Sequence, residues 1–67
     1  MAVAKVTEII ASSSKSFDDA VVNGIKRANK TIKGIRGAWI AQEKIKVEGG
    51  KITEFRVTMR VTFVLKD

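Results

Sequence analysis

"ITEFRVTMRVTFVL", residues 52–65, is the stretch that decides the fold of this chain. Its odd positions from 55 to 65 are apolar, whereas its even positions from 54 to 62 carry charged residues or threonine. Successive side chains of a β-strand point to opposite faces, so this alternation predicts a long, half-buried strand with one dry face. Residues 38–48 form a second extended segment, joined to the first through Gly49 and Gly50, a pair typical of a tight hairpin.

The segment before the hairpin has the pattern of a helix. Across residues 17–32, apolar residues recur at helical spacing, and lysines and arginines lie mostly on the other side. Two aspartates near the start and lysines toward the end suit the helix dipole. We expect the helix to end at Gly34 or Gly37, since glycine commonly follows the last helical turn.

A strand and a serine-rich segment precede this helix. Residues 3–10 are rich in β-branched side chains broken by single polar residues, which predicts a strand. Residues 11–16 then look like a loop that runs into a helix cap. Ser16 and Asp19 have the spacing of a capping box, and earlier serines of the same loop would serve nearly as well. The predicted order is strand, helix, strand, strand, in a single α+β domain over residues 1–67.

Length and composition restrict how such a chain becomes stable. A domain below roughly 70–80 residues usually needs an additional source of stability, such as a disulfide, a bound metal ion or self-association. The chain has no cysteine and no histidine, which excludes disulfides and most zinc sites, while 45% hydrophobic residues are too many for a disordered chain. We therefore expect self-association. No signal peptide and no apolar run of membrane-spanning length is visible, so we expect a cytoplasmic protein without a membrane partner.

The position of Trp39 is the main functional question. If the hairpin turns on Gly49 and Gly50, residues whose numbers sum to 99 lie opposite each other. The predicted pairs are Ile40 with Met59, Trp39 with Arg60, Ala41 with Thr58, and Glu43 with Arg56. Trp39 then lies on the face away from the helix, where another subunit or a ligand would cover it. A cation–π contact with Arg60 and an ion pair between Glu43 and Arg56 are expected on this face.

The order and length of these elements resemble the dodecin family over residues 5–65. Three stretches carry the resemblance: VTEII at residues 6–10 before the serine loop, IKRA at residues 25–28 with Thr31 one turn later, and FRVTMRVTF at residues 55–63. The resemblance implies a three-stranded antiparallel sheet wrapped around one helix, assembled into a hollow homododecamer. It also implies flavins stacked in pairs between tryptophans of neighbouring subunits, stored rather than turned over.

Two positions depart from the family pattern. The flavin-stacking tryptophan would fall at Gly37, and Trp39 lies two residues further along the same side of the strand, about 6–7 Å away. The glutamine that would bond the flavin edge is replaced by Arg56, which can donate but not accept a hydrogen bond. The candidate site is then Trp39 as the stacking ring, Arg56 at the ring edge or a phosphate, and Gln42 and Glu43 nearby, with Gly37 beside the ring.

These residues are compatible with several functions. A binding and storage shell for FMN or riboflavin, or a similar flat anionic molecule, is the first hypothesis, and the +6 net charge suits FMN better. The alternative is a flavin-free structural shell, with or without bound ions, in which Trp39 is interface packing. The charge has a plainer explanation in solubility. Nucleic acid is not favoured because a basic helix face without a binding motif is usually only solvated. Catalysis is not expected, because the chain has no histidine and no cysteine and its serines have no visible base partner.

Overall fold

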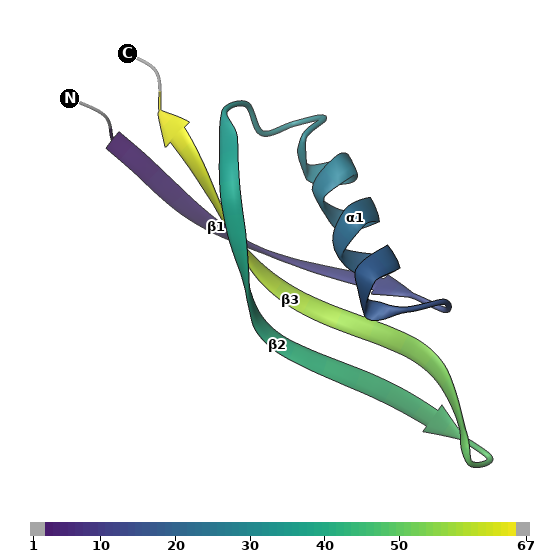
Figure 1. The fold of residues 1–67 in the computed structure, drawn as a ribbon. Coiled ribbons are helices and arrows are strands. Elements are labelled where there is room, and N and C mark those ends of the chain that lie inside the picture. The colour runs from purple at the N-terminus through teal and green to yellow at the C-terminus, as the bar shows by residue number, and fades with distance from the viewer. Residues whose placement is uncertain (1–2, 66–67) are drawn as a thin grey trace.

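The computed structural model describes residues 3–65 (Figure 1). The elements are strand β1 (Val3–Ser13), helix α1 (Phe17–Ala28), strand β2 (Ile35–Glu48) and strand β3 (Lys51–Leu65). The three strands form one antiparallel sheet in the order β1-β3-β2, with β3 at its centre, and α1 lies on one face of it. The predicted element order and class are confirmed. Residues 1, 2, 66 and 67 of the expected domain lie outside the described residues.

The first strand is longer than the sequence pattern predicted. Ser12 and Ser13 pair with Arg56 and Phe55 of β3, so the expectation of a loop from residue 11 was wrong. The physical reason is that β3 offers backbone partners along its full length, and the ladder of backbone hydrogen bonds outweighs the weak strand preference of serine.

The predicted cap at Ser16 is confirmed. The backbone N–H of Asp19 donates to Ser16 Oγ at 2.9 Å, and Ser16 itself has an extended backbone. The hydroxyl of Ser13 donates to Asp19 Oδ2 at 2.6 Å, which ties the end of β1 to the first turn of α1. The serine segment therefore contributes both to the sheet and to the start of the helix.

Replacing Ser16 with alanine is expected to lower the free energy of unfolding by about 1 kcal/mol, because one N–H at the helix start loses its acceptor. Chemical denaturation followed by far-UV circular dichroism measures the change. Ser14→Ala is the matched control: Ser14 is exposed and makes no side-chain hydrogen bond to residues 3–65, so the free energy should change by less than about 0.5 kcal/mol. Equal losses in both variants would contradict the assigned cap.

The helix ends earlier than expected. Its last residue is Ala28. After it, the backbone forms a tighter turn, in which the N–H groups of Lys30 and Thr31 donate to the carbonyl oxygens three residues earlier. Ile32 is thus outside the helix, although the periodicity included it. Gly34 has φ of 79° and begins the path into β2, where its carbonyl accepts from the N–H of Val64 at 3.0 Å. A left-handed backbone favours glycine, so Gly34 follows the helix exit without capping it.

The core lies between α1 and the central strand. The fully buried residues are Ala20 of α1 and Val57, Met59 and Val61 of β3. The predicted dry face of β3 is therefore confirmed at Val57, Met59 and Val61, whereas Leu65 at the end of the strand is 45% exposed. Gly24 allows the close approach of the helix: a Cβ there would lie 2.8 Å from both Ala11 Cβ and Met59 Cε. The helix packs on β1 and β3, which leaves the helix-side face of β2 without cover in the protomer.

Candidate functional site

The hairpin register explains which side chains share a face. Gly49 and Gly50 have φ of 59° and 79°, as a tight two-residue turn requires, and Trp39 pairs with Arg60 as predicted. Ile40 also pairs with Met59 as predicted. The predicted pairs Ala41–Thr58 and Glu43–Arg56 are wrong. The register shifts between Lys46 and Val47, between Ile40 and Gln42, and between Ile35 and Gly37.

These shifts change the face of one candidate residue. Thr53 is an extra residue on β3 and Ala41 an extra one on β2, so the strands are displaced by one residue between the two bulges. Glu43 now pairs with buried Val57 and lies on the helix side of the sheet. Its place opposite Arg56 is taken by Lys44, a residue that the sequence analysis did not include. A one-residue slip moves a side chain to the other face, and bulges carry little sequence signal.

The expected side-chain contacts on the outer face are also different. Arg56 Nη2 lies 2.8 Å from Glu54 Oε2, so its ion pair is with its own strand and not with Glu43. Arg60 Nε lies 3.5 Å from Glu8 Oε2 of β1. The predicted cation–π contact between Trp39 and Arg60 is not formed. Within residues 3–65, the aromatic side chains in contact are Phe17 and Phe55, which pack edge to face.

We call the sheet face away from α1 the polar face. Its candidate residues on β2 and β3 are Gly37, Trp39, Gln42, Lys44, Arg56, Thr58 and Arg60. Trp39 is 48% exposed, and a Cβ at Gly37 would meet nothing within 4 Å, so the strand is open beside the indole. An exposed aromatic ring with amide, hydroxyl and guanidinium groups around it can stack on a flat polar molecule and bond its edges.

A cationic hollow lies at one end of the polar face. Its volume is 320 Å³, and its lining residues are Lys44, Ile45, Lys46, Glu54 and Arg56. Arg56 lies four positions along β3 from Arg60, the partner of Trp39, which corresponds to about 13 Å along the strand. The ring and the hollow are therefore far enough apart for a ligand that carries its anionic group at a distance from its aromatic part.

Residues 3–65 form neither a metal-ligand cluster nor a membrane-spanning helix. Among residues 3–65, no three carboxylate, histidine or cysteine side chains gather into a cluster that would hold a metal ion. The helix within this range is also too short and too polar to cross a bilayer.

Comparison with known proteins places the fold. The family model described as Dodecin matches residues 3–66. The chain belongs to the dodecin family. It is similar to the calcium dodecin of Mycobacterium tuberculosis, with 33% identity over 67 residues that cover 98% of this chain and 93% of the relative. The expected family resemblance, element order and antiparallel sheet are thereby confirmed.

Solved dodecins have nearly the same protomer. A dodecin from Streptomyces davaonensis has a TM-score of 0.93 and 30% identity, covering 98% of this chain and 97% of its own. The Mycobacterium tuberculosis calcium dodecin, described as calcium chelating with a novel calcium-binding site, has a TM-score of 0.81 and 31% identity, covering 96% and 91% of the two chains. The fold is thus shared with solved dodecins, one of which is named for calcium.

Proposed function

We propose that this dodecin is a binding and storage protein that assembles into a homo-oligomeric shell, a dodecamer, and holds a flavin between copies at the polar face. One observation carries the proposal: the half-exposed indole of Trp39 lies on a sheet face that no helix or strand of residues 3–65 covers. An indole is costly to leave in water and well suited to stack on an isoalloxazine ring.

Self-association is supported by the amount of apolar surface that the protomer leaves in water. Large apolar side chains are 42–64% exposed on both faces of the sheet. These are Val6, Ile10 and Trp39 on the polar face, and Ile40, Ile45 and Val47 on the helix side. Burial of apolar surface is worth roughly 25 cal/mol per Å², so contact between copies would add to the small core of a 67-residue chain.

The ligand roles follow the geometry of the polar face. Trp39 stacks on the ring, with the open space at Gly37 beside it, and Gln42 bonds the ring edge. Arg56 and Lys44, at the cationic hollow, bind the phosphate of FMN. Glu43 leaves this set because its side chain lies on the helix side of the sheet. FMN is preferred over riboflavin because charge-assisted hydrogen bonds to a phosphate are roughly twice as strong as neutral ones.

The alternative is a flavin-free shell in which Trp39 packs between copies. It is favoured by the apolar neighbours of Trp39 on the polar face, Val6 and Ile10, which a sister copy would cover as well as a ligand does. Similarity to a protein named calcium dodecin favours ion binding within this alternative. Neither function needs catalysis: Ser13 and Ser16 bond Asp19 and the helix start, a structural use of the serine segment.

The test is titration of the purified protein into FMN and, in parallel, into riboflavin, with flavin fluorescence as the readout. Stacking on Trp39 is expected to quench both, and the phosphate contacts are expected to make FMN bind roughly tenfold more tightly, about 1.4 kcal/mol. Salt should weaken FMN more than riboflavin, because part of its binding is electrostatic. Unchanged fluorescence of FMN in the presence of an assembled shell would reject flavin binding and leave the structural alternative.

A further inference from the structure

Helix α1 divides the helix side of the sheet into two surfaces that the protomer leaves uncovered. One is a row of β2 side chains, which we call the β2 strip: Ile40, Glu43, Ile45 and Val47. Ile40, Glu43 and Ile45 pair with Met59, Val57 and Phe55 of the dry face of β3, and Val47 follows Ile45 by two residues on the same side. The three apolar members are 42–54% exposed, and Glu43 is the charged one among them.

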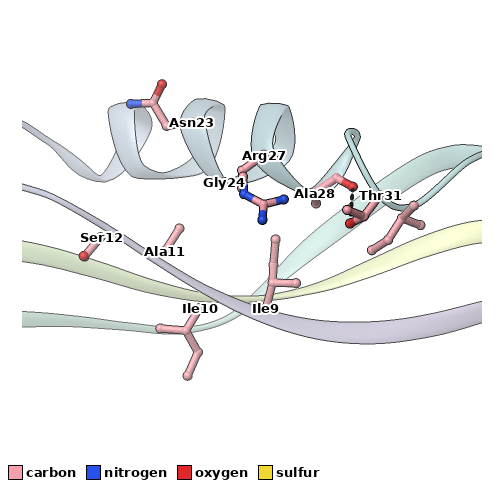
Figure 2. A pocket seen from close by; sticks show the side chains of 10 residues that line it. Ile9, Ile10, Ala11, Ser12, Asn23, Gly24, Arg27, Ala28 and Thr31 are labelled. Atoms are coloured by element: carbon pink, nitrogen blue, oxygen red, sulfur yellow. Dashed lines mark hydrogen bonds between the residues drawn. The ribbon is translucent and has the colours of Figure 1, made fainter.

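The second surface is a groove between α1 and β1, which we call the α1–β1 groove (Figure 2). Its volume is 410 Å³, and its apolar lining includes Ile9, Ala11, Ala28 and Ile32. Figure 2 shows the side chain of Arg27 reaching from α1 toward β1 across this groove. The groove lies on the β1 side of the helix, whereas the strip lies on the β2 side, because the sheet order is β1-β3-β2.

The two surfaces are complementary in chemistry. The strip is a row of β-branched side chains with one carboxylate, and the groove has an apolar floor with one guanidinium above it. Within residues 3–65, neither Glu43 nor Arg27 takes part in an ion pair; the three that form join Lys46 with Glu48, Arg56 with Glu54, and Arg60 with Glu8. Residues 20–42 also contain five basic residues and no acidic one, so Arg27 has no acidic neighbour along the chain.

We propose that the β2 strip of one copy packs into the α1–β1 groove of the next copy, with the Glu43 carboxylate bound to the Arg27 guanidinium. This inference rests on the self-association proposed above. Strip and groove are different surfaces, so the contact is heterologous, and each copy gives its strip to one neighbour and its groove to another. In a closed shell, contacts of this kind join the copies into rings. A guanidinium and a carboxylate can form two parallel hydrogen bonds, which also fixes the register of the neighbours.

The test is a charge exchange, read as native mass at fixed protein concentration. Glu43→Arg and Arg27→Glu each place like charges in contact, so each is expected to lower the assembled fraction at least tenfold. The double variant with both changes is expected to restore assembly to within about twofold of the unchanged protein, because the pair is re-formed with its signs reversed. Far-UV circular dichroism of each variant shows that the helix and sheet are intact.

Two matched controls change charge without touching the contact. Lys26→Glu makes the same charge change one residue before Arg27 but does not line the groove, and Glu48→Arg does so on β2 near the turn. Both should assemble like the unchanged protein. Full assembly of the single variants, or a double variant as weak as either single one, would overturn the proposed contact. If Glu43→Arg and Arg27→Glu both assemble fully, the remaining candidate occupant of the α1–β1 groove is a small amphipathic anion. If the protein without substitutions is a monomer, both the proposed contact and the proposed shell are rejected. If it assembles but does not bind FMN, only the proposal of flavin binding is rejected.

Discussion

Replacing Met59 with alanine is expected to lower the free energy of unfolding by about 2–5 kcal/mol, a large share of the total for a chain of this size. Met59 is completely buried at the centre of β3, and its Cε lies beside Gly24 of α1. Alanine would leave a cavity between the helix and the central strand. The backbone of β3 cannot move to fill it, because hydrogen bonds to β1 and β2 hold the strand on both sides.

The measurement is urea denaturation at one fixed protein concentration, because assembly would make apparent stability depend on concentration. Met59→Leu is the control: it has nearly the same volume, so the loss should stay below about 1.5 kcal/mol. A loss for Met59→Ala no greater than that for Met59→Leu would mean that the site collapses without a cavity, and the assignment of Met59 as the central core residue would fail.

The second large effect concerns Trp39. Replacing it with alanine is expected to weaken FMN binding roughly tenfold to hundredfold, since stacking on one aromatic side chain is worth about 1–3 kcal/mol and each flavin would lose its platform. The native mass is expected to stay unchanged, because the β2 strip and the α1–β1 groove do not include this residue. Fluorescence titration and native mass on the same sample measure both properties.

Trp39→Phe is the matched variant for this experiment. Phenylalanine keeps an aromatic face on the same strand position, so most of the flavin affinity should remain. The flavin-free alternative predicts a different pair of results: Trp39→Ala would break the shell, and neither variant would change FMN fluorescence. A lower native mass of Trp39→Ala together with unchanged FMN fluorescence would therefore show that Trp39 packs between copies and does not stack on a flavin.

The accuracy of the structure predicted from the sequence differs from one element to the next. The alternation of β3 predicted its dry face correctly, because Val57, Met59 and Val61 repeat a signal with the period of the strand itself. The cap at Ser16 was also predictable, since a hydroxyl three residues from a free N–H is a local feature. The helix end was not, because its periodicity continued past Ala28 into a turn.

The candidate site was predicted less completely than the fold. The Trp39–Arg60 pairing was correct because the displacements at Thr53 and Ala41 cancel before Trp39 is reached. Between those two bulges, the prediction placed Glu43 on the wrong face and did not include Lys44. Compared with the prediction, the polar face therefore has one more cation and one fewer carboxylate there.

By itself, the sequence determined the properties that depend on short spacings along the chain. These are the order of elements, the helix start, the hairpin turn and the two faces of the central strand, each set by preferences acting within a few residues. Only the tertiary structure decided which β2 side chains share a face with Trp39, how far β1 extends, and which surfaces α1 leaves bare. Those outcomes depend on backbone pairing between distant segments, where one extra residue reverses a face while the local preferences stay the same.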